Sequence, residues 1–308
     1  MKTTFRRQQG AVMMVLAMIL FATGSSYMLA VLNANSASLM RQQDAGQALI
    51  AAKEAIIAYA VMHGDFYGIA GAGPGHLFCP DTNNNGQENS PCAGNALGRL
   101  PRSIVLPSGD NFPLSDYGSG IDQQLWLAVA PAFKRAPAGV LNSAIAGNLT
   151  LDGQPGIAAV LIAPGEPLAG QTRGNNTAAN YLEGANTSLP DFSTGSNAAP
   201  GTFNDRVLAI RSTEILTPVT VRVAERVRQA LGAYHLANGF FPVDQATFNA
   251  VLAVAGVMPP WYVTNGWPGV TNYSRLSINV ATVQFTGCAI SFTLNAGVVA
   301  LGKSQNRC

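Results

Sequence analysis

The sequence predicts an α+β protein, in which a long N-terminal transmembrane and amphipathic helix carries a head of antiparallel β-strands. The first ground for this prediction is an uncharged apolar run over residues 11–32. The second is a helical spacing of apolar residues that continues to His63. The third is a set of short apolar segments, separated by Pro- and Gly-rich turns, in the rest of the chain. A second helix followed by strands begins near Glu214. This similarity to the first helix and its strands suggests that the helix-and-strand unit is duplicated without the anchor.

Length and composition favour an anchored chain with two small domains. The chain has 308 residues, of which 48% are hydrophobic and 11% are charged. Gly (32) and Pro (18) are plentiful, so much of the apolar fraction belongs to the anchor and to small-residue loops. The formal net charge is +2, and no stripe of Lys and Arg alternates with aromatic residues. Both observations argue against a nucleic-acid partner.

The first ten residues orient the apolar run in a membrane. They contain Lys2, Arg6 and Arg7 and no acidic residue, so the positive-inside rule keeps this end in the cytoplasm. At about 1.5 Å per residue, a helix over 11–32 spans about 33 Å and crosses the lipid of a bilayer once. The rest of the chain is then expected outside the cytoplasm. The alternative is a secretory signal peptide cleaved near residues 33–37, for which the apolar run is long.

The junction between Gly10 and Ala11 resembles the prepilin-type leader of type IV pilins and secretion pseudopilins. The resemblance implies cleavage between these residues by the prepilin peptidase, a location in the bacterial inner membrane, and assembly with other pilins or pseudopilins through the N-terminal helix. Ordinary members have Glu at the fifth mature position, where this chain has Val15. K-type minor pseudopilins and X-type minor pilins also lack this Glu. The resemblance therefore points to a minor, tip-type subunit rather than a bulk fibre subunit.

Helix-forming residues continue from Asn33 to His63 without a proline. Apolar residues such as Leu49 and Ile56 recur at helical spacing, and Gly64 is the expected stop. A helix over 11–63 would be about 80 Å long. We expect its first half to lie in lipid or in a fibre core and its second half to pack on the head.

The four cysteines fall into two sequence-local pairs in a chain that we expect to be exported. Pairing of Cys79 with Cys92 and of Cys288 with Cys308 is the simplest of the three possible connectivities. A structural role is favoured over a nucleophilic one for the first pair. The second bridge would resemble the C-terminal disulfide loop of pilins.

The segment between the first two cysteines matches the opening of an EF-hand-type loop, in which alternate oxygens face one cation and Gly86 permits the turn. The twelfth loop position, normally Glu, is Cys92, so Glu88, or Asn89 with water, would have to complete a Ca²⁺ site. The alternative is an Asx-rich turn in which these side chains bind their own backbone. The candidate calcium ligands are Asp81, Asn83, Asn85 and Glu88.

Two apolar segments of the head, 125–130 and 156–163, are expected strands. The combination of CPDTNNNG, GRLP and LWLAVAPAF resembles the head of prepilin-like proteins over about residues 70–210. Residues 164–205 are rich in Gly, Asn, Ser and Thr and show no periodicity. Their composition favours a flexible excursion, and a surface that binds a glycan or a partner is the alternative.

The last third of the chain predicts a second amphipathic helix over 219–239, with a stop at Gly239. Like the first helix, it ends in glycine followed by an aromatic residue. Segments 276–285, 288–294 and 297–301 are expected to form a small antiparallel sheet.

No pattern of catalytic residues is present in the sequence, and we expect neither an enzyme nor an organic cofactor. The three histidines are isolated in sequence, which favours helix-end or solvated positions. The tryptophans could stack on sugars, although core packing is the favoured role. They are Trp126, Trp261 and Trp267.

The expected organisation is a leader over 1–10, a membrane and amphipathic helix over 11–63, a first head over 64–213, and a second helix with its sheet over 214–308. The resemblance implies a structural minor pilin or pseudopilin-like subunit of a type IV pilus or of a type II secretion-type fibre. The alternative is a membrane-anchored binding protein or adhesin outside any fibre, which would use segment 164–205 or the tryptophans.

Overall fold

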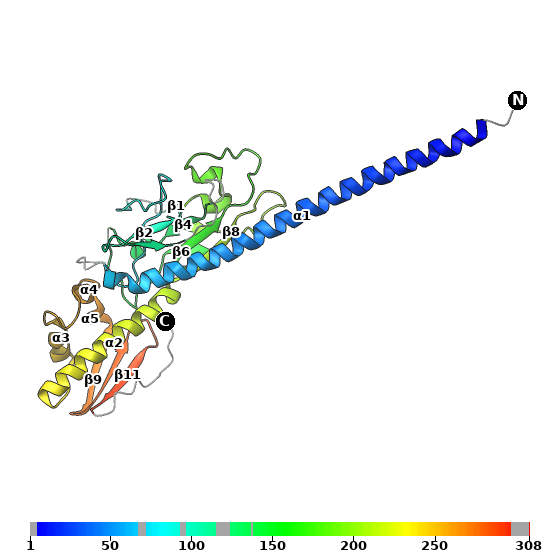
Figure 1. Cartoon of the computed structure of the whole chain (residues 1–308). Helices are drawn as coiled ribbons and strands as arrows, with labels where there is room; N and C mark the ends of the chain where they lie inside the picture. Colours follow the sequence, from blue (N-terminus) through cyan, green and yellow to red (C-terminus); the bar gives the residue numbers. More distant parts are fainter. Residues whose placement is uncertain (1–4, 67–71, 93–96, 115–123, 137, 297–307) are drawn as a thin grey trace. The chain divides into compact units, whose positions relative to one another are not determined.

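A computed structural model describes residues 5–66, 72–92, 97–114, 124–136, 138–296 and 308. The chain separates into two compact units, residues 1–47 and residues 48–308. Helix α1, Phe5–Phe66, contributes to both units and continues past the expected stop at Gly64. The fold class is mixed α+β, with one apolar N-terminal helix and mainly antiparallel sheets, as the sequence predicts (Figure 1).

The larger sheet of the second unit has the order β1-β4-β6-β5-β7, with β8 added to β6. Its long strand β6 pairs antiparallel with β4, β5 and β8. Residues 157–163 of β6 are at most 1% exposed. A continuous run of small and branched apolar residues suits such a strand, because both of its faces are covered. The strands are β1 (Leu97–Arg99), β4 (Trp126–Val129), β5 (Leu149–Leu151), β6 (Gln154–Ala163), β7 (Asp191–Phe192) and β8 (Arg206–Arg211), and a separate hairpin contains β2 (Ser103–Val105) and β3 (Asn111–Pro113).

Residues 48–66 of α1 pack on this sheet through an apolar stripe at helical spacing. Lys53 Nζ donates a hydrogen bond of 3.0 Å to the Ala209 carbonyl of β8 and forms a 2.6 Å ion pair with Glu214. These contacts fix the helix over one face of the strands (Figure 1). The buried stripe contains Leu49, Ala52, Ile56, Tyr59 and Ala60.

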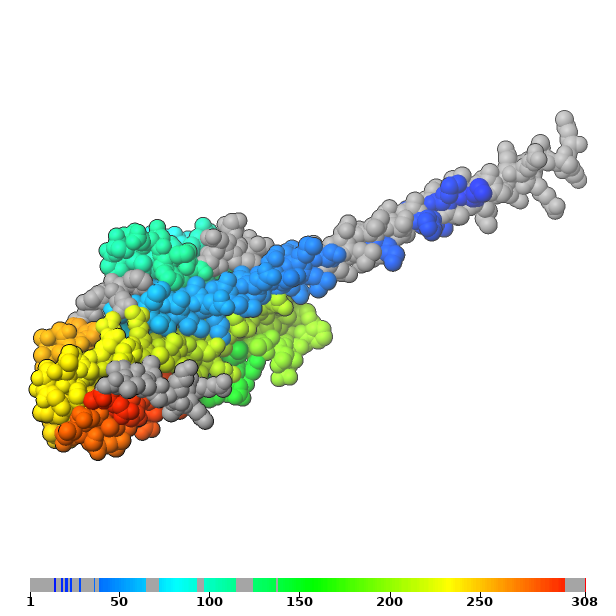
Figure 2. Space-filling view, turned by 60° about the horizontal axis from the view of Figure 1, so that its bottom comes forward, coloured from blue at the N-terminus to red at the C-terminus, as the bar shows by residue number. Residues whose placement is uncertain are grey.

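Helix α2, Ser212–Asn238, contains the predicted second helix and ends at the predicted glycine. Gly239 has a φ of 80°, and its N–H closes the helix on the His235 carbonyl. Arg222 of α2 donates to the Val61 carbonyl of α1 at 2.8 Å. Since Lys53 meets Glu214 and Val61 meets Arg222, α2 and the 48–66 part of α1 run side by side in the same direction, as Figure 2 shows.

Beyond α2 lies a three-stranded antiparallel sheet of order β11-β10-β9. The predicted strand 276–285 is wrong as one element, because β9 ends at Ser277 and a turn through Ile278 and Asn279 precedes β10. The expected strand 297–301 lies outside the described residues. The remaining elements are α3 (Gln245–Ala253), α4 (Pro260–Thr264), α5 (Trp267–Val270), β9 (Thr271–Ser277), β10 (Val280–Phe285) and β11 (Ser291–Asn295).

Both predicted disulfides are present, Cys79–Cys92 and Cys288–Cys308. The second one joins the chain's last residue to the turn before β11. The backbone N–H of Cys308 also donates to Thr217 Oγ1 of α2 at 3.1 Å. The C-terminus is therefore fastened to both the helix and the sheet of this region.

Segment 164–205 is a packed part of the head and not the flexible excursion that its composition favours. It contains the short 3-10 helices η2 (Ala178–Asn180) and η3 (Gly184–Thr187) as well as β7. Tyr181, Leu182 and Phe192 are buried. Their irregular spacing follows neither a helix nor a strand, which explains why periodicity did not reveal them.

Candidate functional site

The N-terminal part of α1 exposes large apolar side chains in an uncharged stretch. There is no charged residue between Arg7 and Arg41. The large apolar side chains described in this stretch are between 59% and 81% exposed. Covering each of them would contribute about 1.5–3 kcal/mol. They are Met14, Met18, Leu20, Phe21, Met28, Leu39 and Met40.

Four of these side chains share one face of the helix. Met14, Met18 and Phe21 follow one another at spacings of four and three residues, and Met28 lies seven residues further on. Such spacing places them in one stripe along the helix. Methionine is unbranched and adapts its shape to irregular apolar surroundings. The stripe is therefore suited to lipid tails or to another helix.

One N-terminal helix is long and apolar enough to cross a membrane. Among the described residues, the stretch that meets this condition is Leu39–Gly64, and 33% of its apolar window is buried. The buried residues of 48–64 contact the rest of the second unit and are closed to lipid. Four charged residues also lie within this stretch, namely Arg41, Asp44, Lys53 and Glu54. The uncharged stripe before it has neither restriction.

The expected cleavage junction lies inside α1. Gly10, Ala11 and Val15 all belong to the helical backbone. Residues 1–4 of the expected leader lie outside the described part of the chain. Cleavage between Gly10 and Ala11 stays a prediction.

The loop closed by Cys79–Cys92 is organised around the carboxylate of Asp81, which is 1% exposed. Its Oδ2 accepts the N–H of Gly86 at 2.7 Å. Its Oδ1 accepts three successive N–H groups, the shortest at 2.6 Å from Asn84. The other two donors are Asn83 and Asn85.

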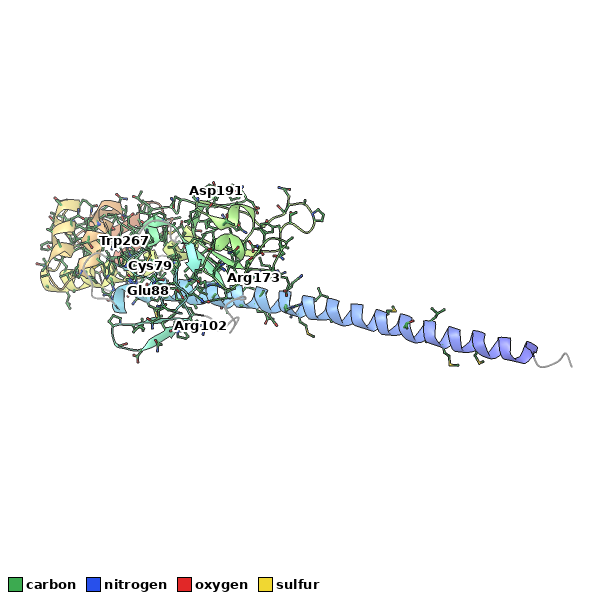
Figure 3. All side chains as sticks on the ribbon, turned by 90° about the horizontal axis from the view of Figure 1, so that it is seen from above. Cys79, Glu88, Arg102, Arg173, Asp191 and Trp267 are labelled. Atoms are coloured by element: carbon green, nitrogen blue, oxygen red, sulfur yellow. A yellow bond between two sulfur atoms is a disulfide. The ribbon has the colours of Figure 1, made fainter. Side chains whose placement is uncertain are left out.

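The other candidate calcium ligands also serve the loop itself. Asn83 Oδ1 accepts the N–H of Asn85, whose own Oδ1 accepts the N–H of Gln87. Glu88 accepts the N–H of Cys79 at 3.0 Å, and both residues are labelled in Figure 3. Glu88 also forms an ion pair with Arg135. In the described part of the chain, no three or more His, Cys, Asp or Glu residues are grouped to hold a metal. This arrangement matches the Asx-rich turn, and the alternative of a calcium site stays untested.

Two histidines that are isolated in sequence meet in the fold. The rings of His63 and His76 lie 6.3 Å apart, and both residues are fully buried rather than solvated. His76 contacts the backbone of Gly73 and Gly139, and burial lowers its pKa. One signal of this burial is present in the sequence, because His63 follows Ile56 by seven residues and Tyr59 by four, which places it on the apolar stripe of the helix. Their burial suits a structural role.

The tryptophans are core residues, with exposed fractions between 0% and 5%. The indole of Trp126 lies 5.0 Å from the guanidinium of Arg99, which also stacks over Tyr181 at 4.3 Å. Trp267 packs edge-on against Phe285. Stacking on sugars is therefore excluded for these rings in this conformation.

Comparisons with protein-family models, with curated proteins and with solved structures found no match. Function must then be inferred from the chain's own residues. Among the described surfaces, the exposed stripe of α1 is the one whose chemistry most clearly requires a partner.

Proposed function

We propose that the chain is a non-enzymatic minor pilin or pseudopilin-like subunit of a type IV pilus or of a type II secretion-type fibre. It is anchored in the bacterial inner membrane and assembles through its N-terminal helix. The observation that carries this proposal is the division of α1 into two kinds of surface. Its uncharged part exposes Met14, Met18, Phe21 and Met28, whereas residues 48–66 form part of the core of an antiparallel head.

The same stripe serves two environments in this proposal. Before assembly it lies in lipid, where an uncharged helix over 11–32 spans the bilayer. During assembly it packs against the helices of neighbouring subunits. Their apolar side chains then replace the lipid tails and are about as apolar as those tails. Lys2, Arg6 and Arg7 hold the leader in the cytoplasm until the prepilin peptidase removes it.

Val15 supports a minor position rather than a repeated one. A Glu at this position of the mature chain is held to pair with the terminal amine of the neighbouring subunit. Val15 has no carboxylate and cannot form such a pair. A subunit at the tip or at the start of a fibre needs this contact least.

The test is the N-terminal sequence of the mature protein, produced in cells that contain a prepilin peptidase. We expect the mature chain to begin at Ala11. Gly10→Val should block the cut, because the peptidase recognises glycine there, whereas the control Gly24→Ala should leave it unchanged. An intact Met1 or a start near residue 38 would overturn the proposal.

A membrane-anchored binding protein is the second candidate, and one observation favours it. Five exposed large apolar side chains lie near the end of α2 and the turn between β9 and β10. A hydrogen bond of 3.0 Å from Phe241 N to the Ile278 carbonyl joins the segment after α2 to this turn. Such a patch suits a partner protein. An unprocessed chain that never cross-links to other subunits would favour this candidate. The patch contains Leu236, Phe240, Val243, Leu276 and Ile278.

A further inference from the structure

Two acidic residues are buried together at the end of segment 164–205. Glu183 and Asp205 are each 6% exposed, and Asn186 between them is fully buried. Ionised carboxylates are costly to bury unless a cation or several hydrogen bonds compensate them. How this pair is stabilised therefore decides how the segment is held.

The two carboxyl groups bind each other's backbone. Glu183 N–H donates to Asp205 Oδ2 at 2.9 Å, and Asp205 N–H donates to Glu183 Oε2 at 3.0 Å. Asn186 Nδ2 adds a bond of 2.9 Å to Asp205 Oδ2, and Gln171 Nε2 adds one of 3.0 Å to Glu183 Oε1. This reciprocal pattern fastens residues 171–186 to the chain that enters β8.

The remaining oxygen of Asp205 has a different environment. Its Oδ1 is buried, and no described group donates a hydrogen bond to it. Since each carboxyl group accepts the backbone N–H of the other residue, the two carboxyl groups lie side by side. Two carboxylates this close repel each other unless one of them holds a proton.

The cations of the neighbouring segments are directed to other groups. Arg173 donates to the Gly165 carbonyl and stacks over Tyr181, and Arg206 is exposed on β8. Burial raises the pKa of Asp205 to about 8, and the negative charge of Glu183 adds to this effect. The hydrogen bonds from Asn186 and from the Glu183 backbone oppose the shift without cancelling it.

We propose that Asp205 is protonated on Oδ1 and shares this proton with the Glu183 carboxylate, and that the shared proton latches residues 171–186 onto the chain that enters β8. Opening the latch separates the two carboxyl groups and releases the Asp205 proton to water. The inference does not depend on the proposed function.

The latch covers a defined part of the core. Tyr181, two residues before Glu183, lies over the guanidinium of Arg99, which stacks on Trp126 of β4. Release of the segment would uncover these three side chains together. The head would thus change its surface with the pH of its surroundings.

The direction of the pH dependence follows from the pKa of Asp205, which is about 8 in the closed state against an ordinary value of 3.8. Opening releases one proton at any pH between these values. The opening equilibrium therefore rises about tenfold per pH unit in this window and levels off above about pH 8. Closure is strongest on the acidic side.

Hydrogen exchange of the full chain in detergent micelles, followed by mass spectrometry and corrected for intrinsic exchange, tests the latch. Between pH 6 and 8 we expect the opening of residues 171–186 to rise about fiftyfold, because the rise begins to level off at the pKa of about 8. Asp205→Asn, which mimics the protonated acid, should abolish this rise. Asp191→Asn, an exposed carboxylate of the same segment, should leave it as in the wild type.

A wild-type segment whose corrected exchange is constant over this range would overturn the proposal, and so would an unchanged rise in Asp205→Asn. If Asp205→Asn does not fold, Glu183→Gln supplies the test. This change removes the negative charge beside Asp205 and should lower the pKa of Asp205. The opening equilibrium of residues 171–186 should then level off at a lower pH. The ¹³C shift of the Asp205 carboxyl group gives an independent reading, and a midpoint below pH 5 in the wild type would also reject the latch.

Discussion

Gly147 shows at the scale of one residue how tightly the head is packed. A Cβ at this position would lie only 2.0 Å from the carbonyl oxygen of Ile157 in β6. The contact is with backbone in a fully buried strand, which cannot move aside as a flexible side chain would. The Gly147 N–H also donates to Ser212 Oγ at 2.7 Å, which joins this turn to the start of α2.

We therefore expect Gly147→Ala to lower the free energy of unfolding by about 1–3 kcal/mol or more. The matched control is Gly232→Ala in α2, where nothing lies within 4 Å of the added methyl group. That change should raise stability by about 1 kcal/mol, because alanine is the better helix former. Denaturant unfolding of the two variants measures both effects. Equal stability of Gly147→Ala and the wild type would contradict the packing described for β6.

Buried polar residues mark the limit of what single residues reveal in the sequence. Glu183 and Asp205 lie in a segment without periodicity, and only the fold brings their carboxyl groups together. His63 and His76 meet for the same reason across the end of α1. Local patterns cannot predict such pairs, because a polar residue at a buried position looks like any solvated residue.

At the scale of elements, the hydrogen bonds of the Cys79–Cys92 loop predict that its stability does not depend on Ca²⁺. Asp81 accepts four backbone N–H groups, and Glu88 is paired with Arg135, so the loop is complete without a cation. We expect the same Tm in calcium and in chelator. Asp81→Ala should lower stability by about 1–3 kcal/mol in both, because it leaves N–H donors without their acceptor.

A rise in Tm on addition of Ca²⁺ that disappears in Asp81→Ala would contradict this prediction and would support a calcium site. The matched control is Asp110→Ala, which removes an exposed carboxylate on another turn and should affect neither measurement strongly.

The strands show which elements a sequence pattern can predict. The run over 156–163 predicts β6, since so many consecutive apolar residues suit a strand that is covered on both faces. The run over 276–285 misleads, because Leu276 and Ile278 continue the alternation although both are exposed. The turn between β9 and β10 contains neither Gly nor Pro. It is closed by the bond from Asn279 N to Ser277 Oγ, which leaves no signal in the apolar pattern.

At the scale of the whole molecule, α1 combines two requirements in one helix. Residues 48–66 pack on the sheet with one face of the helix only, and this explains why their buried residues form a narrow stripe. Residues between Arg7 and Arg41 carry no charge, which is the composition that a membrane-spanning segment requires. Composition and periodicity predict the helix and its change from an uncharged stretch to an amphipathic one. They do not predict the packing of α1 beside α2, because this packing depends on contacts of Lys53 and Arg222 with partners that are distant in sequence.

The membrane role of the first part of α1 is tested by a charge placed at its centre. Phe21 is 81% exposed and lies near the middle of the 11–32 run. Phe21→Arg should cost about 2.5–3.5 kcal/mol of insertion free energy, so that less of the chain remains in membranes after an alkaline wash. Ile50→Arg is the matched control, because Ile50 is an exposed apolar residue of the same helix that follows Arg41. Equal retention of Phe21→Arg and the wild type, or an equal loss in Ile50→Arg, would show that this stripe does not hold the chain in lipid.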